Sequence, residues 1–129
     1  MKRKFALLLA VIIGSFCIAF AQNSIKNLTP QEYDKAVKKD PKAVILDVRQ
    51  PEEYKTGHIK GAILLNALDE QSFEKGLKQM DKTKTYYLYC RSGKRSNMAA
   101  QKMQKAGFKV MELKGGLKSW IKAEMPLEK

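Results

Sequence analysis

Short apolar runs alternate with amphipathic segments along most of the chain. Residues 43–48 are continuously apolar except for Asp47, which is typical of a strand buried on both faces. Residues 62–65 form a second apolar run, residues 85–89 are rich in aromatic side chains, and residues 109–113 alternate as strand residues do. We therefore predict four strands at these positions.

The segments between the predicted strands contain helix signals. Thr29 can cap a helix that starts at Pro30, Glu32 completes a capping box, and Asp40-Pro41 ends that helix. Apolar spacing and turn residues predict further helical segments at 51–54, 72–80, 96–106 and 117–123. Strands and helices that alternate at this spacing predict an α/β fold with a mainly parallel sheet.

The first 21 residues are predicted to be a secretory signal peptide. Three basic residues (2–4) precede an almost wholly apolar stretch, and Ala19-Phe20-Ala21 fits the small-x-small rule for cleavage. The alternatives are an uncleaved membrane anchor, since residues 5–21 just reach the length of a span, and lipidation at Cys17, which the bulky Phe16 disfavours. We expect residues 22–129 to form one exported domain without stable membrane association. It would be periplasmic where the cell has an outer membrane and extracellular otherwise.

Composition narrows the possible functions. The chain of 129 residues has 25 Lys and Arg against 13 acidic residues, a net charge of +12. The basic residues are scattered rather than interleaved with aromatic ones, which favours a solvated Lys-rich surface and disfavours nucleic-acid binding. A single histidine argues against a histidine metal site, so no metal is expected. Once the signal is removed, Cys90 is the only thiol and no internal disulfide can form.

Reactive chemistry is predicted in the segment around Cys90. This residue follows a predicted strand and precedes a predicted helix, where open α/β sheets bind their ligands. Backbone N–H groups of a glycine-containing loop and of a helix start form an anion site, and Arg91, Lys94 and Arg95 add positive charge. These features favour thiolate, the nucleophilic form of cysteine. The alternative is that Cys90 is only a small buried apolar residue.

Several separated motifs resemble single-domain rhodanese sulfurtransferases. Residues 90–95 match that family's six-residue loop, C-R-x-G-x-R. The segments L-D-V-R (46–49), P-E-E-Y (51–54), G-H-I-K-G-A (57–62), A-G-F (106–108) and G-G-L-K-S-W (115–120) resemble its other motifs. Lys60 stands where the family usually has proline, and only a local effect is expected. The resemblance runs from about Thr29 to Pro126 and implies a rhodanese-like α/β fold, with a mainly parallel central sheet flanked by helices on both faces.

The resemblance also implies a sulfurtransferase that needs no metal or organic cofactor. The Cys90 thiolate would attack the outer sulfur of thiosulfate or a similar anionic donor, and sulfite would leave. A persulfide would remain on Cys90 until cyanide or a thiol accepted the sulfur. The expected catalytic residue is Cys90, and the residues expected to bind the donor are Arg91, Ser92, Gly93, Lys94 and Arg95.

Two upstream residues, Asp47 and Arg49, complete the expected site, each with two possible roles. Asp47 either braces a loop arginine such as Arg95 or caps the end of its strand. Arg49 either contacts the anionic donor, which the resemblance favours, or pairs with a glutamate of the P-E-E-Y motif. His58 is expected to be structural rather than the base of a Cys–His dyad.

Three other functions are weighed against the enzyme. The chain could be a persulfide carrier or interaction module that passes sulfur to a protein, with little turnover of small molecules. An inert scaffold is disfavoured by the intact Cys90. Phosphatase or arsenate reductase chemistry is disfavoured by loop length, because tyrosine phosphatases place five residues between cysteine and arginine and this chain has Ser96 at that position.

Overall fold

The computed structural model describes residues 24–129. The predicted signal peptide, including Cys17, lies outside the described residues. Within residues 24–129, no helix has the length and apolar character needed to cross a membrane.

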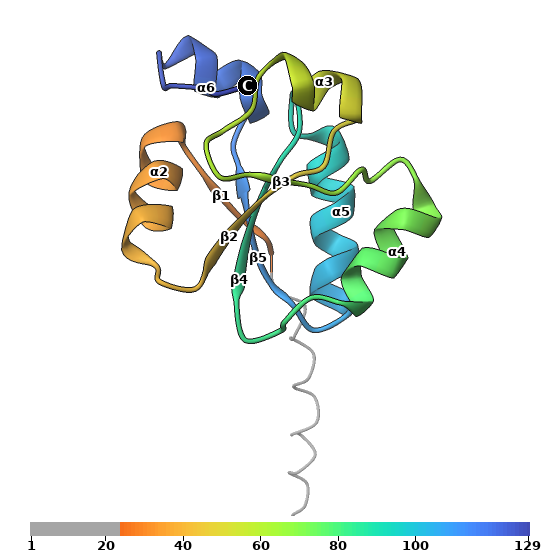
Figure 1. Ribbon diagram of the computed structural model, residues 1–129. Coiled ribbons are helices and arrows are strands. Elements are labelled where there is room, and N and C mark those ends of the chain that lie inside the picture. Colours follow the sequence, from red (N-terminus) through yellow and green to blue (C-terminus); the bar gives the residue numbers. More distant parts are fainter. Residues whose placement is uncertain (1–23) are drawn as a thin grey trace, which may run out of the picture.

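Strands and helices alternate along the described chain around one five-stranded sheet (Figure 1). The strand order is β1-β5-β4-β2-β3, and every pairing is parallel. The predicted α/β class with a parallel sheet is therefore confirmed. The strands are β1 (Lys26–Leu28), β2 (Ala43–Asp47), β3 (Ile63–Leu64), β4 (Thr85–Tyr89) and β5 (Lys109–Leu113), and the helices are α2 (Pro30–Lys39), α3 (Pro51–Thr56), α4 (Glu70–Lys78), α5 (Lys94–Lys105) and α6 (Gly116–Lys122).

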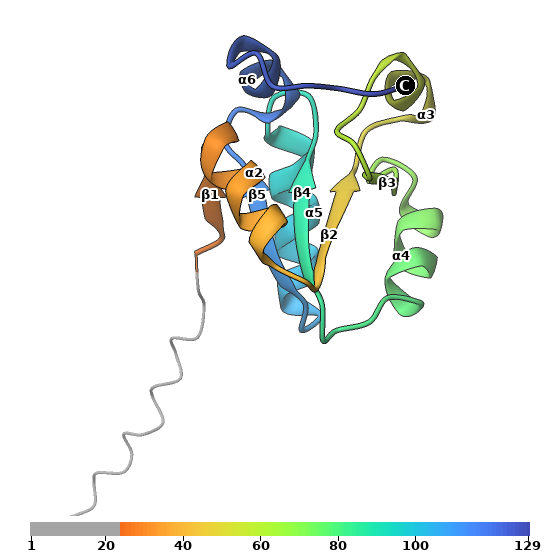
Figure 2. The same cartoon turned by 60° about the vertical axis from the view of Figure 1, so that its left-hand side comes forward.

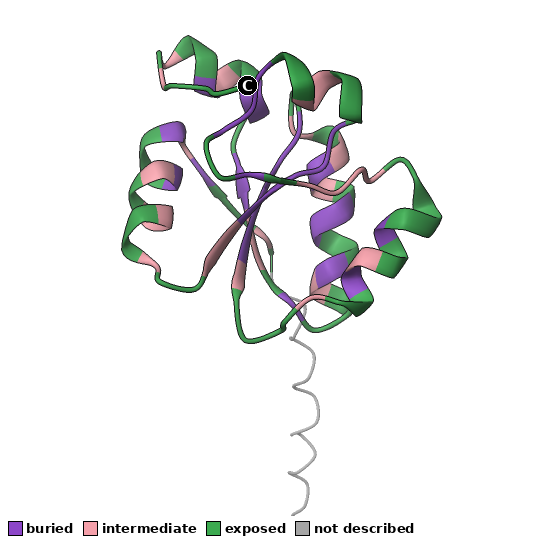
Figure 3. Ribbon diagram, in the orientation of Figure 1, coloured by how far each residue is buried: buried purple, intermediate pink, exposed green. Residues whose placement is uncertain are grey.

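Helices cover both faces of the sheet, as expected. Side chains alternate along β2 and β4, so that Leu46 and Leu88 face α4 and α5, while Ile45 and Tyr87 face α2 and α6. Two separate apolar cores result, one on each face, and the central strands are buried on both sides (Figure 3). Figure 2 shows α2 and α4 on opposite sides of the sheet.

The order in which strands are added to the sheet reverses between β2 and β4. It leaves β2 toward β3 on one side and then returns to form β4 on the other side of β2. Asp47 at the end of β2 lies opposite Tyr89 at the end of β4. The loops after these two strands therefore start side by side at the carboxyl edge, where open parallel sheets bind their ligands.

The last residues of the chain return to this same edge. After α6 the tail runs across to α3 (Figure 2), where the backbones of Glu128 and His58 exchange two hydrogen bonds of 2.8 Å. The indole of Trp120 donates to the carbonyl of Pro126 at 2.8 Å. The tail thus joins α6 to the loop that follows α3.

Candidate active site

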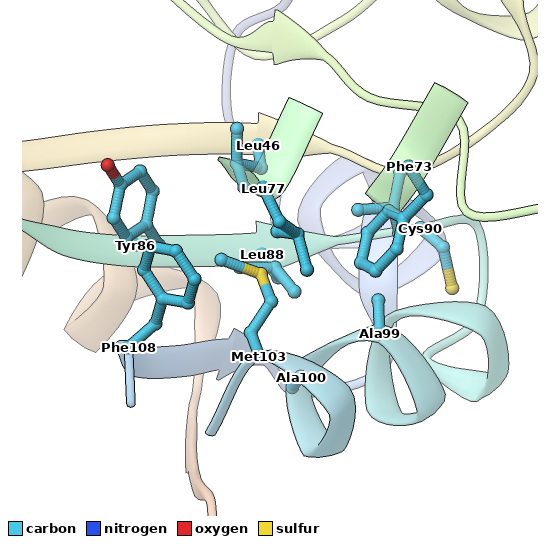
Figure 4. Close-up of a cluster of buried hydrophobic side chains, with 11 residues drawn as sticks. Leu46, Phe73, Leu77, Tyr86, Leu88, Cys90, Ala99, Ala100, Met103 and Phe108 are labelled. Atoms are coloured by element: carbon cyan, nitrogen blue, oxygen red, sulfur yellow. The ribbon is translucent and has the colours of Figure 1, made fainter. Parts of the chain in front are cut away.

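Cys90 follows the last residue of the central strand β4. It is only 1% exposed and ends the apolar core that faces α4 and α5, beside Phe73 and Ala99 (Figure 4). Gly93 closes the loop in the left-handed conformation, with φ +109°, and α5 starts at the next residue. A glycine fits this position because an L side chain would be strained there. The helix predicted from residue 96 therefore begins two residues earlier, at Lys94.

Several donors from the loop and the start of α5 surround the sulfur. The Gly93 N–H lies 3.0 Å from Sγ of Cys90. Burial acts to raise the pKa of the Cys90 thiol, but the N–H and hydroxyl of Ser96 and the N–H groups of Gly93 and Ser92 together lower it below its usual value. The expected amide nest around the sulfur is therefore present in the structure.

The cationic side chains of the loop differ in their exposure and in their ion pairing. Arg91 and Lys94 are exposed, as is Ser92, whereas Arg95 is half-buried. The Arg95 guanidinium binds both carboxylate oxygens of Glu53, at 2.7 and 3.0 Å, and so connects α5 to α3. This pair lowers the pKa of Glu53 to about 2, mainly through the hydrogen bonds from Arg95. No local sequence pattern indicates this pair, because Glu53 and Arg95 are far apart in the chain.

Asp47 and Arg49 form a pair of their own at the end of β2, which decides between the two roles expected for Asp47. Asp47 accepts hydrogen bonds from the Arg49 guanidinium at 2.7 and 2.9 Å and from the hydroxyl of Tyr89 at 2.6 Å. The expected brace between Asp47 and Arg95 is therefore wrong. The alternative, that Asp47 caps the end of its strand, is confirmed, because its carboxylate also accepts a hydrogen bond from the backbone N–H of Arg49 at 3.0 Å. Arg49 is only 4% exposed and also donates to the carbonyl of Gly57 at 2.7 Å. Among the described residues it forms no ion pair with a glutamate of α3, and its contact with an anionic donor stays a prediction. The pair fixes the loop after β2 from inside.

The His58 side chain contacts α3 and the C-terminal tail. Its ring stacks on Tyr54, with centroids 3.8 Å apart, and its Nδ1 lies 3.0 Å from the Tyr54 carbonyl oxygen. Its Nε2 lies 3.5 Å from the carboxylate of Glu128. These contacts support the structural role expected for His58.

Glu112 lies buried behind the loop and was not identified from the sequence. It is 1% exposed on β5 and accepts hydrogen bonds at 2.8 Å from the Ser96 hydroxyl and from the Asn97 side-chain amide. One signal was available, because Glu112 is a charged residue within a segment that was predicted to be a strand. It shares a face of β5 with Val110, two residues away.

The start of α6 holds the other side of the loop. The N–H of Leu117 donates to the Cys90 carbonyl at 2.9 Å, and the N–H of Lys118 donates to the Arg91 carbonyl at 3.0 Å. Gly116 makes this close approach possible, because a Cβ there would lie 2.5 Å from the Arg91 carbonyl oxygen. The loop is thus attached to two helices and a strand.

No group of three or more potential metal ligands occurs among residues 24–129.

Comparison with known proteins identifies the family. The model of the rhodanese-like domain matches residues 29–123, most of the chain. The chain belongs to the rhodanese-like domain family. The match covers every motif on which the resemblance was based.

Individual relatives agree with this assignment. The chain is 36% identical over 119 residues to the "Uncharacterized protein YqhL" of Bacillus subtilis. The match covers 90% of this chain and 86% of YqhL. It is 36% identical over 99 residues to the B. subtilis "Putative sulfur carrier protein YrkF". That match covers 76% of this chain and 52% of YrkF. A crystal structure of thiosulfate sulfurtransferase from Pseudomonas aeruginosa superposes with a TM-score of 0.68 at 27% identity, covering 81% of this chain and 20% of that one. Family membership and these names support sulfur transfer in general.

Proposed function

We propose that this rhodanese-like domain is a sulfurtransferase that moves a sulfane sulfur from thiosulfate or a similar donor to cyanide or a thiol. The observation that supports this most directly is the Cys90 sulfur, which lies in a six-residue loop of the family's form with the Gly93 N–H 3.0 Å away. Donors at this distance stabilise a thiolate, the form of cysteine that attacks sulfur.

Transfer takes place in two displacements at sulfur. In the first, the Cys90 thiolate attacks the outer sulfur of thiosulfate, the S–S bond breaks, and sulfite leaves with the electron pair. In the second, cyanide or a thiolate attacks the terminal sulfur of the Cys90 persulfide, and Cys90 is restored as thiolate. No external oxidant or reductant is consumed when the acceptor is cyanide, since thiocyanate is the product. One covalent intermediate shared by two half-reactions gives ping-pong kinetics.

The loop cations have separate tasks in this scheme. Arg91 and Lys94 are exposed and can meet the anionic donor as it enters. Arg95 is tied to Glu53 at the side of the loop, close enough to Cys90 for their charges to interact. It would stabilise the charge that develops on the leaving sulfite. The backbone N–H groups of Ser92 and Gly93 would hold the persulfide sulfur.

Intact mass spectrometry tests the central step. The domain is mixed with thiosulfate and desalted, and we expect a mass gain of one sulfur that disappears after cyanide is added. Cys90→Ser is the matched control and should gain nothing. A wild-type protein without the added sulfur, or a variant that still gains it, would contradict the proposal.

A persulfide carrier that delivers sulfur to a protein is the second candidate. Leu68 and Met98 are 59% and 58% exposed, and together with Arg95 they line a shallow pocket beside the loop. Exposed apolar side chains next to a reactive group are typical of a surface that contacts another protein. A carrier would form the persulfide stoichiometrically but turn over cyanide slowly, so steady-state thiocyanate production separates it from the enzyme.

A further inference from the structure

Lysine side chains are concentrated at the edge of the sheet opposite Cys90. Because the strands are parallel and the helices run back between them, the starts of the strands lie together with the ends of α2, α4 and α5 at this amino edge (Figure 1). The same segments contain only two acidic residues, Asp40 and Asp81. We call this surface the basic edge and define it by eight exposed lysines: Lys26, Lys39, Lys42, Lys78, Lys82, Lys84, Lys105 and Lys109.

Four of these lysines form a row across the starts of the strands. The register of β2, β4 and β5 aligns the residue after Lys42, the residue after Lys84, and Lys109 itself. Lys26 begins β1, the next strand along. Since neighbouring strands lie about 5 Å apart, the row spans only about 15 Å. Four positive charges are therefore presented close together along one line.

The charge of this row is not neutralised within the domain. None of its four lysines takes part in an ion pair among residues 24–129. The Asp40 carboxylate accepts hydrogen bonds from the Lys42 N–H at 2.9 Å and from the Tyr87 hydroxyl at 3.0 Å. The Asp81 carboxylate accepts from the N–H and the hydroxyl of Thr83, at 2.8 and 2.7 Å. Both carboxylates are thus engaged by neutral donors rather than by the lysines.

Helix electrostatics explain only part of the basic edge. Lys39, Lys78 and Lys105 occupy the last positions of their helices, where a positive charge interacts favourably with the helix dipole. A lysine on an edge strand such as β1 also hinders pairing with another sheet. Lys84 and Lys109 belong to inner strands and to no helix end, so neither reason applies to them. The fold itself does not require the row.

The composition of the basic edge distinguishes between possible partners. The arginines among residues 24–129 all lie at the carboxyl edge, so the basic edge presents lysines only. Its aromatic side chains, Tyr86 and Phe108, are 2% and 4% exposed, and no large apolar residue is listed as exposed there among the described residues. Single-stranded nucleic acid stacks on exposed aromatic side chains, and protein interfaces are anchored by aromatic side chains and arginine. Lysine point charges without such anchors fit the phosphate groups of anionic lipids.

We propose that the basic edge binds the surface of a membrane rich in anionic phospholipids, with Cys90 turned away from the membrane. The course of the chain supports this orientation, since the described chain begins at the same edge, just before Lys26, and the apolar residues 5–21 precede it in the sequence (Figure 2). The basic edge would keep the contact after cleavage of the signal. Attachment by surface charge is reversible, in keeping with the expected lack of stable membrane association. The contact is independent of the proposed sulfur transfer.

Cosedimentation of residues 22–129 with lipid vesicles tests the contact. This part of the chain contains the complete sheet and both apolar cores, so it folds without the apolar residues 5–21, which would insert into vesicles by themselves. The vesicles are either phosphatidylcholine alone or equal parts of phosphatidylcholine and phosphatidylglycerol. We expect binding to the anionic vesicles only, weakening steeply as salt rises above about 0.1 M. Failure to bind them, or equal binding to both kinds, would overturn the proposal.

Two variants with the same change in net charge locate the contact. The edge variant combines Lys26→Gln, Lys42→Gln, Lys84→Gln and Lys109→Gln. The control combines Lys55→Gln, Lys60→Gln, Lys118→Gln and Lys122→Gln, which are exposed on the carboxyl side of the sheet. Each lysine near an anionic surface strengthens binding about fivefold, so the edge variant should bind about 100-fold more weakly, while the control keeps most of its affinity. Equal losses would show that net charge alone attracts the domain, which contradicts the proposal.

Acetylation of lysines provides a second measurement if the edge variant does not fold. The wild-type domain, free or bound to anionic vesicles, is treated briefly with acetic anhydride, and the modified lysines are identified by peptide mass spectrometry. We expect vesicles to protect Lys42, Lys84 and Lys109 but not Lys60 and Lys118. Protection on the carboxyl side instead, or equal protection on both sides, would refute the orientation.

A single-stranded oligonucleotide distinguishes a lipid surface from nucleic acid. It is offered to the domain in competition with the anionic vesicles, at equal phosphate concentration and equal salt. We expect the domain to remain on the vesicles. Preferential transfer to the oligonucleotide would mean that the basic edge binds nucleic acid and would overturn the assignment to lipid. None of these measurements needs a sulfur donor, so failure of the proposed function would not be mistaken for failure here.

Discussion

At the scale of single residues, the Cys90 thiol is subject to two opposing influences. Burial favours the neutral thiol, whereas donors from Ser96, Gly93 and Ser92 favour thiolate and outweigh burial. We expect the pH midpoint of iodoacetamide alkylation to lie below that of a free cysteine, near 8.5. Cys90→Ser serves as the blank. A midpoint at or above the free value would mean that the loop does not activate its sulfur, and the inert scaffold would become the better interpretation.

Arg95 is predicted to act on the reaction as well as on the fold. Arg95→Ala should lower thiosulfate turnover by about 10- to 1,000-fold, the range for loss of one charge-stabilising donor. Glu53→Gln is the matched comparison, because it weakens the same pair but keeps the arginine charge beside Cys90. It should retain most of the turnover. If both variants lose activity equally while folded, Arg95 serves only to hold α5 against α3.

The sequence located the loop at Cys90 better than it predicted the hydrogen-bond partners of the surrounding side chains. Cys90 and its loop could be identified because six consecutive residues form one motif. Asp47 was recognised as a buried carboxylate that needs a partner, but the choice of Arg49 depends on how the chain turns after β2. Ion pairs between segments distant in sequence, such as Glu53 with Arg95, leave no local pattern.

At the scale of elements, the start of α6 controls the shape of the loop. Gly116 has φ +65°, and a Cβ at this position would lie 2.5 Å from the backbone carbonyl oxygen of Arg91. We expect Gly116→Ala to lower the free energy of unfolding by about 2–4 kcal/mol, from strain and a backbone clash together. Gly61→Ala is the control, because φ is +84° there but nothing lies within 4 Å of the added Cβ. It should cost about 1 kcal/mol from strain alone. Equal losses in urea unfolding would show that the contact with the loop is unimportant.

The pair between α3 and α5 predicts a pH dependence of stability. The pKa of Glu53 falls from 4.5 to about 2 in the folded protein, chiefly through hydrogen bonds from Arg95. Because the folded pKa is the lower one, the pair stabilises the fold above pH 4.5, and this is lost as the pH falls toward 2. We expect Glu53→Gln to be about 1–2 kcal/mol less stable than wild type at pH 7, allowing for solvent screening. The two proteins should converge near pH 2. A difference that is constant with pH would exclude the charge as its cause.

Elements with strong local signals were predicted well, and those formed through pairing were not. The capping box of α2 is present, because the Glu32 carboxylate accepts a hydrogen bond from the Thr29 N–H at 2.9 Å. β1 was missed because its three residues, mostly exposed, become a strand only by pairing with β5. The predicted strand at 62–65 shrinks to Ile63–Leu64 at the sheet edge, where it has one neighbour. α4 starts two residues earlier than expected because Asp69 caps it.

At the scale of the whole molecule, parallel topology separates the site from the start of the domain. β1 and β4 run in the same direction, so the chain enters the sheet at its amino edge, while Cys90 lies at the carboxyl edge (Figure 2). An anchor before residue 24 would therefore leave the loop accessible. Activity assays cannot distinguish a cleaved signal from an anchor, and the length of the mature chain has to be measured directly.

We propose export with cleavage after Ala21, so that the mature protein begins at Gln22. Intact mass analysis of protein expressed from the full sequence in a Gram-negative host should find the shortened chain in the periplasmic fraction. Ala21→Arg is the control, since a bulky charged residue at the cleavage position blocks processing and should leave the full-length chain in the membrane fraction. Wild-type protein that keeps residues 1–21 in the membrane would favour the anchor. Export would also place Cys90 in an oxidising compartment without a second cysteine in the mature chain, so no internal disulfide could remove the thiol from sulfur transfer.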